Sequence, residues 1–209
     1  SGTTGTPLRL WWSRETVRAW YALFEARGRR WYGVSRQDRW AILGGQLVTP
    51  VKQRRPPFWV WNAALSQLYV SSYHLAPDLI PYYLEALERY RVRYLYGYSS
   101  SLNAVAQEAL RRGWRVSGLA VAVTNAEPLY EHQRQAISEA FRCPVRETYG
   151  MAEIVAAASE CEHGRLHLWP EVGLVEVAGG DGDGAGELIC TGLLNADMPL
   201  IRYRNGDRG

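Results

Sequence analysis

Three short segments of this chain combine residue types that suit nucleotide binding. Residues 1–7, Ser-Gly-Thr-Thr-Gly-Thr-Pro, join glycines to hydroxyl side chains. Glycines let a backbone approach a phosphate, and threonine hydroxyls donate hydrogen bonds to its oxygens. Residues 147–153 and 203–208 each add a tyrosine and a carboxylate. An aromatic plane suits a purine, and carboxylates suit a hard divalent cation or ribose hydroxyls. The three segments together predict an ATP site.

Residues 1–7 do not form a Walker loop, because the Gly-Lys-Ser/Thr ending is absent. A P-loop NTPase is therefore disfavoured. Taken without the other two segments, the composition of this stretch favours a disordered, tag-like start.

The helices and strands that must position these segments alternate regularly along the chain from residue 77 onward. The pattern predicts helices over residues 77–90, 101–112 and 129–141, and strands over residues 92–96, 119–123 and 145–148. Such alternation predicts crossover units and a parallel sheet, so the fold class is α/β. Ligands bind at the carboxyl ends of such strands. The segments that follow these strands, 96–99, 124–127 and 149–150, are thus expected to line one rim.

Outside that region the patterns are shorter. Val17, Trp20, Tyr21 and Phe24 predict an amphipathic helix over residues 13–27, stopped by Gly28. Short strands are expected over residues 40–43 and 46–48, around the Gly-Gly pair at 44–45. The basic loop 52–57 is read as a phosphate contact or as a solvated loop, and the second reading is favoured.

Beyond residue 153 the pattern changes to hairpins. Segments 166–168, 174–177 and 187–190 read as strands, with a Gly/Asp-rich turn over residues 179–186. We therefore expect an α/β portion over residues 1–155 that binds ATP and a smaller β-rich portion over residues 156–209.

Composition is that of a globular protein, with 47% apolar and 22% charged residues and a net charge of +3. The sequence has no long block of like charges, so nucleic acid is not expected as a partner. No apolar run reaches the length of a membrane helix, so no membrane span is expected and a cytoplasmic location is. Three widely spaced cysteines suit free thiols. Because the chain begins inside a motif, we expect it to be part of a longer protein.

The three segments resemble motifs of the adenylate-forming superfamily of acyl-CoA synthetases, adenylation domains and luciferases. Residues 1–7 resemble its phosphate loop, residues 147–153 its Tyr-Gly-x-x-Glu motif, and residues 203–207 its Tyr-Arg-x-Gly-Asp motif. Residues 56–59, 71–75 and 96–100 are similar to the phenylacetate-CoA ligase and coenzyme F390 synthetase branch. Within that branch they are particularly close to CapK-like members linked to capsular polysaccharide biosynthesis. The resemblance spans the whole chain.

The resemblance implies a role for each matching residue. The phosphates of ATP would be wrapped by Ser1, Gly2, Thr3, Thr4, Gly5 and Thr6. Tyr149 would stack on adenine beside Gly150 and Met151. The base would be flanked by Asn125, Ala126 and Glu127.

Two carboxylates and a substrate pocket complete the implied site. Glu153 would ligate Mg²⁺ and, with Thr4, act as a catalytic residue, while Asp207 would accept hydrogen bonds from the ribose. His74 and Tyr98 are candidates for the pocket of a small carboxylic acid. Each of these residues also has a plain reading as a packing or surface residue. The chain departs from the family at two positions: Asn205 replaces a usual threonine, and Leu8 replaces a common lysine.

The implied activity is that of an AMP-forming carboxylate–CoA ligase, acting on an aryl or fatty acid with ATP, Mg²⁺ and CoA. In the family a lysine from a C-terminal domain completes adenylation. Lys52, the sole lysine of this chain, lies in the wrong context, so we expect the 209 residues alone to adenylate poorly. The alternative is a catalytically incomplete nucleotide-binding module of the same fold. Cys161, His163 and His167, with Cys143, offer zinc-ligand types, although a turn with incidental polar residues is favoured.

Overall fold

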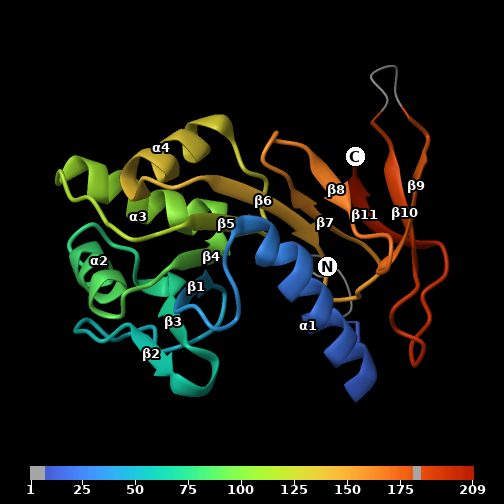
Figure 1. Ribbon diagram of the computed structural model, residues 1–209, viewed down its shortest axis with the longest axis horizontal. Helices are drawn as coiled ribbons and strands as arrows, with labels where there is room; N and C mark the ends of the chain where they lie inside the picture. The colour runs from blue at the N-terminus through green and yellow to red at the C-terminus, as the bar shows by residue number, and fades with distance from the viewer. Residues whose placement is uncertain (1–7, 181–184) are drawn as a thin grey trace. The chain divides into compact units, whose positions relative to one another are not determined.

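The computed structural model describes residues 8–180 and 185–209, and the chain forms two compact units. One unit comprises residues 29–147, and the other joins the N-terminal residues up to 28 with residues 148–209. Figure 1 labels the helices and strands of both. The phosphate-loop prediction falls on residues 1–7, which lie outside the described residues.

The unit of residues 29–147 is built on a mainly parallel sheet. Its strands are β1 (Trp40–Gly44), β2 (Trp59–Asn62), β3 (Gln67–Ser71), β4 (Tyr94–Tyr98), β5 (Val121–Asn125) and the first residues of β6 (Val145–Gly150). They follow the order β2-β3-β1-β4-β5-β6, and only β2 runs antiparallel to its neighbour. The predicted α/β class with a parallel sheet is confirmed.

Helices α2 (Ile80–Arg89), α3 (Ser99–Arg111) and α4 (Glu131–Phe141) connect the parallel strands, as the alternation predicted. Three short 3₁₀ turns also occur: η1 (Arg30–Tyr32), η2 (Ala63–Leu65) and η3 (Ser72–His74). One sheet face, carrying Ala41, Leu43 and Leu95, packs with these helices into the main core. The other face carries Trp40 and Tyr94, whose rings stack with centroids 5.6 Å apart.

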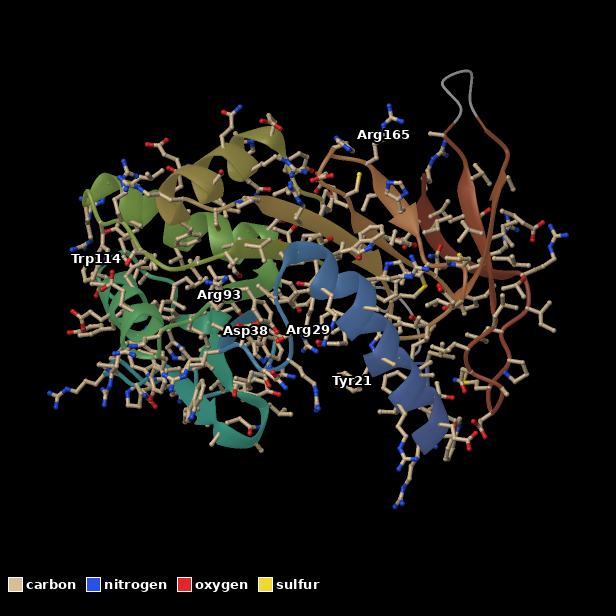
Figure 2. The ribbon with its side chains drawn as sticks, viewed as in Figure 1. Tyr21, Arg29, Asp38, Arg93, Trp114 and Arg165 are labelled. Carbon is tan, nitrogen blue, oxygen red and sulfur yellow. The ribbon has the colours of Figure 1, made fainter. Side chains whose placement is uncertain are left out.

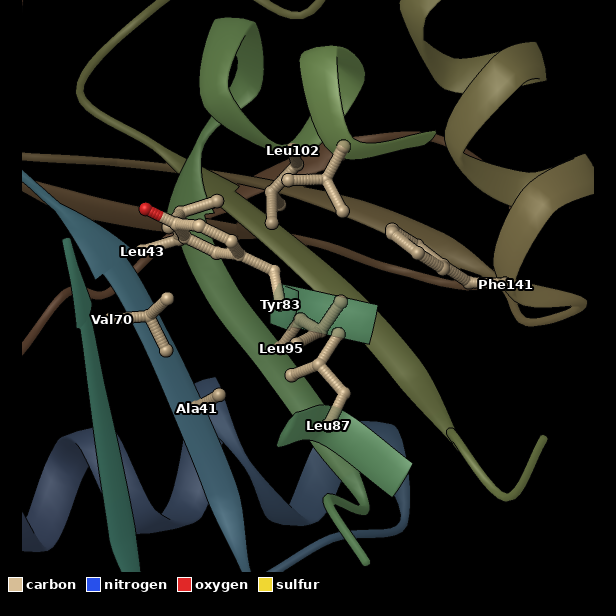
Figure 3. Close-up of a pocket in the computed structure, with 9 residues that line it drawn as sticks. Ala41, Leu43, Val70, Tyr83, Leu87, Leu95, Leu102 and Phe141 are labelled. Atoms are coloured by element: carbon tan, nitrogen blue, oxygen red, sulfur yellow. The ribbon is translucent and has the colours of Figure 1, made fainter. Parts of the chain in front are cut away.

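A small cavity lies inside the main core, between the sheet and the helices (Figure 3). Its volume is about 20 Å³ and its nine lining residues, among them Leu43, Tyr83 and Leu102, present no polar surface to it. A space of this size holds at most about one water molecule, and an apolar one stays dry. This cavity is therefore a packing defect and offers no room for a substrate.

The prediction of a second strand over residues 46–48 is wrong. The chain leaves the sheet after Gly44, and residues 46–48 belong to no strand. A hairpin there would need an antiparallel partner, whereas β1 is already paired on both sides by the parallel strands β3 and β4. Residues 46–48 instead form a loop beyond the carboxyl end of β1.

The second unit contains helix α1 (Arg14–Gly28), the end of β6, and strands β7 (Ala157–Glu160) and β8 (Leu166–Leu168). A separate antiparallel sheet joins β9 (Gly173–Ala178), β10 (Glu187–Gly192) and β11 (Tyr203–Arg208). The end of β6 pairs with β7, and β7 with β8, both antiparallel. The predicted hairpin character of this region is confirmed.

Helix α1 matches its predicted range and ends at Gly28. Its packing face is made by Trp20, Leu23 and Phe24, and Trp20 meets Trp169 with ring centroids 5.6 Å apart. Tyr21 was expected on that face but is 59% exposed, and Figure 2 labels it on α1. The apolar stripe is thus rotated by about one residue from the predicted one. No helix within the described ranges has the length and apolar character needed to cross a membrane.

Candidate nucleotide and acid sites

Residues from two of the predicted motifs meet in the second unit. Tyr149, on β6, donates a hydrogen bond of 2.7 Å from its hydroxyl to Oδ2 of Asp207 on β11. Asn205 Nδ2 donates to the same Tyr149 oxygen at 2.8 Å and to Asp207 Oδ2 at 3.0 Å. The structure thereby brings the adenine and ribose candidates into one hydrogen-bonded cluster.

The local backbone explains how β11 presents both polar side chains. Gly206, between them, has φ of +84°, a left-handed conformation that glycine adopts without strain. The backbone N–H of Asp207 donates to Asn205 Oδ1 at 2.9 Å, which fixes the asparagine side chain over its own turn. Asn205, the departure from the family pattern, is thus a structural member of the cluster.

The electrostatics of the cluster keep the Tyr149 hydroxyl protonated. Burial raises the pKa of Tyr149 well above its usual value, and the nearby Asp207 carboxylate raises this pKa further. A protonated phenol remains a donor, so it holds Asp207 in place. Asp207 itself is exposed, so an oriented carboxylate faces solvent and can accept hydrogen bonds from a diol.

Glu153 lies in the same unit, in the loop after β6, and is 5% exposed. Its Oε1 accepts a hydrogen bond of 3.3 Å from the Tyr203 hydroxyl. Its Oε2 is buried and has no hydrogen-bond partner among the described residues. A buried carboxylate oxygen without a partner is costly, and a bound cation removes that cost.

This orphaned oxygen fits the Mg²⁺ that the resemblance implies. Mg²⁺ is commonly held by one or two carboxylates together with substrate phosphates and water. Glu153 would supply the protein oxygen. Within residues 8–180 and 185–209, no three His, Cys, Asp or Glu side chains gather as a metal-binding group, and this includes Cys161, His163 and His167.

A separate cavity of about 180 Å³ lies in the unit of residues 29–147, at the carboxyl ends of the parallel strands. Tyr98 ends β4 and Asn125 ends β5, and these two residues are register neighbours. The full lining is Ile42, Gly44, Gly45, Gln46, Val48, Tyr69, Val70, Tyr98 and Asn125. Two of the three strand-end segments predicted to share a rim therefore do so.

One wall of this cavity is held in place by side chains of η3. Ser72 Oγ donates to the carbonyl of Gly44 at 2.8 Å, and the Tyr73 hydroxyl donates to that of Gly45 at 3.1 Å. A Cβ at Gly45 would lie 2.7 Å from the Tyr98 hydroxyl, too close for contact. Glycine at this position therefore lets the Tyr98 ring approach the wall.

His74, expected in the acid pocket, is not among the residues that line this cavity. It is 2% exposed, and its ring stacks on Phe58 with centroids 4.9 Å apart. Its Nδ1 lies 2.8 Å from Ser71 Oγ and its Nε2 lies 3.2 Å from the Pro50 carbonyl. Since the carbonyl only accepts, the Nε2–H of His74 donates to it. His74 thus ties down the loop that supplies part of the lining.

The segment after β5 has an unusual backbone. Ala126 has φ of +61°, in the left-handed region that non-glycine residues seldom occupy. Glu127 Oε2 accepts from the backbone N–H of Ser100 at 2.9 Å and from Ser99 Oγ at 3.3 Å, at the N-terminus of α3. A carboxylate is favoured there by the helix dipole. The Glu127 side chain is therefore engaged at the N-terminus of α3.

The remaining predicted positions are placed more simply. Gly150 is the exposed last residue of β6. Met151 packs near Tyr149, and its sulfur lies 3.5 Å from Asn205 Nδ2. Sequence reasoning missed the contributions of Tyr203, Gly45 and the η3 hydroxyls. The Gly-Gly pair beside a strand was the one signal in the sequence for the Gly45 wall.

No protein-family model matches the chain. The chain is 32% identical over 177 residues to Protein CapK of Staphylococcus aureus, an alignment that covers 84% of this chain and 39% of that protein. It is also 32% identical over 120 residues to the phenylacetate-coenzyme A ligase of Thermus thermophilus, covering 52% and 27%. The chain thus spans less than half the length of these relatives.

Among solved structures, 2-hydroxyisobutyryl-CoA ligase in complex with 2-HIB-AMP and CoA matches with a TM-score of 0.64 and 19% identity. That match covers all of this chain and 46% of the ligase. The fold is accordingly that of the acyl-CoA synthetases. Together with the two relatives, it places the chain in the adenylate-forming superfamily, in the branch of phenylacetate-CoA ligase and CapK-like proteins.

Proposed function

We propose that the protein containing this chain is an AMP-forming ligase that activates a small carboxylic acid as an acyl-adenylate and transfers the acyl group to CoA. The observation that carries the proposal is the hydrogen-bonded cluster of Tyr149, Asn205 and Asp207. It joins two motifs that, in the family, belong to the nucleotide site. The membership of the chain in the phenylacetate-CoA ligase and CapK-like branch supports the same activity.

In this proposal the second unit holds the nucleotide. Tyr149 stacks on adenine, Asp207 binds the ribose hydroxyls, and Glu153 binds Mg²⁺. Residues 1–6 wrap the β- and γ-phosphates, with Thr4 as a catalytic donor to the departing charge. The exposure of Asp207 and the orphaned Glu153 oxygen support these assignments.

The unit of residues 29–147 supplies the acid pocket. The cavity at the strand ends is the space we assign to the acid, with Tyr98 in its lining. A carboxylate oxygen attacks the α-phosphorus, the bond to pyrophosphate breaks, and an acyl-adenylate forms. The CoA thiolate then attacks the acyl carbonyl, and AMP leaves with the C–O bond electrons. The protein contributes mainly positioning and charge stabilisation.

The finer parts of the proposal concern the longer protein. A lysine from a C-terminal domain would complete the adenylation step. Lys52, the only lysine of this chain, lies in the loop 52–57, which is the wrong context for that role. The acid is aryl or fatty. We extend the proposal to a role connected with capsular polysaccharide synthesis in the cytoplasm, on the resemblance of residues 56–59, 71–75 and 96–100 to CapK-like members.

The test is AMP formation by the whole protein with ATP, Mg²⁺, CoA and a panel of aryl and fatty acids. We expect AMP with at least one acid, and pyrophosphate exchange with the same acid in the absence of CoA. ATP binding without AMP from any acid would contradict the ligase assignment and favour a nucleotide-binding module. The 209-residue chain alone is expected to exchange pyrophosphate far more slowly than the whole protein.

A further inference from the structure

The side chain of Asn125 has an unmet hydrogen-bonding need. Its Oδ1 is buried and has no partner in the described part of the chain, although Asn125 lines the cavity at the strand ends. Most buried polar side-chain atoms in proteins have a partner, and an exception calls for an explanation. A ligand group that donates a hydrogen bond to this oxygen explains it.

A donor and an acceptor line the same cavity. Tyr98 is the register neighbour of Asn125, and the residue opposite its hydroxyl is the glycine at position 45. A ligand hydroxyl can both donate to an amide oxygen and accept from a phenol. The pair of side chains therefore suits a hydroxyl group better than a purely apolar one.

The rest of the lining and the size of the cavity limit the body of the ligand. Ile42, Val48 and Val70 provide apolar surface, and Tyr69 adds an aromatic side chain. The volume is about 180 Å³. An engineered protein cavity of about 150 Å³ binds benzene, so this space accepts one ring with a small substituent. An extended acyl chain of ten or more carbons exceeds it.

We infer, on the basis of the proposed function, that the acid is a compact single-ring carboxylic acid with a ring hydroxyl that donates to Asn125 Oδ1. Asn125 is then a specificity-determining residue through its side chain. The aryl alternative of the proposed function is therefore favoured over the fatty one.

The experiment uses the whole protein with phenylacetate, its three ring-hydroxylated isomers and decanoate. AMP release gives kcat/KM for each acid, and calorimetry gives the acid affinity without turnover. We expect kcat/KM for the best hydroxylated isomer to exceed that for phenylacetate by about tenfold or more, since an acid without the hydroxyl leaves a buried acceptor without its donor. Decanoate should give neither AMP nor binding.

Asn125→Leu should remove the preference for the hydroxyl, so that kcat/KM for the best hydroxylated isomer falls to the value for phenylacetate. The matched control is Asn103→Leu on α3, whose Oδ1 is also buried without a described partner but which does not line the cavity. This control should keep the preference. Circular-dichroism melts of both variants check that they fold.

Each outcome separates this inference from the proposed function. AMP formation with decanoate at the rate of the ring acids overturns the inference and leaves the ligase activity intact. A rise in the ATP KM of Asn125→Leu with every acid assigns the side chain to the nucleotide, which also overturns it. Absence of AMP with all acids, with hydroxyl-dependent binding that Asn125→Leu abolishes, overturns the ligase function and supports the ligand class.

Discussion

The hydroxyl of Tyr149 donates a hydrogen bond of 2.7 Å to Oδ2 of Asp207, which lies 58 residues further along the chain. Tyr149 belongs to the motif at residues 147–153 and Asp207 to the motif at residues 203–208. Burial and the Asp207 charge both keep the pKa of Tyr149 high, so the donor persists throughout the neutral range. The orientation of one proposed nucleotide contact therefore depends on the other.

Asp207→Ala is expected to raise the KM for ATP of the whole protein by about 10- to 100-fold. A hydrogen bond to a charged group is worth about 1.5–3 kcal/mol, and each 1.4 kcal/mol is about tenfold. Tyr149→Phe should cost less, because it keeps the aromatic plane and removes only the hydroxyl. Steady-state kinetics with varied ATP measure both effects.

Asp197→Ala is the control for this prediction, because Asp197 is also an exposed aspartate of the same unit. Its KM for ATP should match that of the wild type. If Asp207→Ala behaves like Asp197→Ala, Asp207 has no role in binding the ribose.

The parts of the fold that could be predicted from sequence are those whose pattern is local. Helices α2, α3 and α4 have apolar residues at helical spacing, and Gly113 follows α3 closely. Strands β4 and β5 are short runs rich in apolar residues between such helices. Alternating strands and helices are joined by crossover connections, and a crossover brings the next strand back in the same direction. The alternation therefore predicts a parallel sheet.

The parts that were missed depend on distant partners. Strand β3 begins at Gln67 and ends at Ser71 and is buried along most of its length. Because its end residues are polar, the sequence pattern does not predict a buried strand there. Leu47 and Val48 looked like a returning strand, yet Leu47 is 66% exposed because β1 already has two parallel partners. Local propensity cannot reveal that competition.

The candidate site shows the same division. The motifs predict roles for Tyr149, Glu153 and Asp207, since their residue types have recognisable chemistry. The part of Asn205 in holding that cluster, and the approach of Tyr98 to Gly45, arise only when distant strands come together. The unmet Oδ1 of Asn125 is also a property of the folded chain.

Glu153→Gln is expected to stabilise the protein in the absence of nucleotide and to weaken its binding of divalent cations. The carboxylate carries a buried oxygen without a described partner, and a neutral amide costs less to bury. We expect the free energy of unfolding to rise by about 1 kcal/mol. The gain in melting temperature on adding ATP with Mg²⁺ should shrink.

Thermal melts with and without Mg²⁺ and ATP, and titration with Mn²⁺ followed by electron paramagnetic resonance, measure the two effects. The control is Glu162→Gln, whose side chain is 82% exposed. Unchanged Mn²⁺ affinity in Glu153→Gln would remove Glu153 from the cation site.

Gly97→Ala should disrupt the junction of β4 and β1. A Cβ at this position would lie 2.4 Å from the Leu43 carbonyl oxygen, so the paired strands must move apart. Overpacking of this kind costs about 1–3 kcal/mol. Because Gly97 precedes Tyr98, the KM for the acid should also rise. The midpoint of urea unfolding measures the loss of stability.

Gly44→Ala is the matched stability control in the neighbouring strand. Its Cβ would meet only Ile42 Cγ1 at 3.8 Å, an ordinary contact. The urea midpoint of this variant should stay close to that of the wild type. Equal destabilisation by the two substitutions would mean that the Leu43 carbonyl does not set the cost at Gly97.

Glu108 on α3 should make the stability of the protein depend on pH below neutrality. Its carboxylate accepts hydrogen bonds from Arg111 at 2.6 and 2.7 Å and from Arg112 at 2.5 Å, although its side chain is only 6% exposed. The Arg111 hydrogen bond is the main cause that lowers the pKa of Glu108 from 4.5 to about 2, against the opposing effect of burial.

A depressed pKa in the folded state means that the unfolded chain binds the proton first as the pH falls. The stabilisation from Glu108 is therefore complete above pH 4.5 and is lost between pH 4.5 and about 2. Glu108→Gln should lower the urea midpoint at pH 7 and flatten its fall over that acid range. Glu131→Gln, at a position 71% exposed on α4, should follow the wild-type profile. An acid profile of Glu108→Gln as steep as that of the wild type would show that other carboxylates govern acid unfolding.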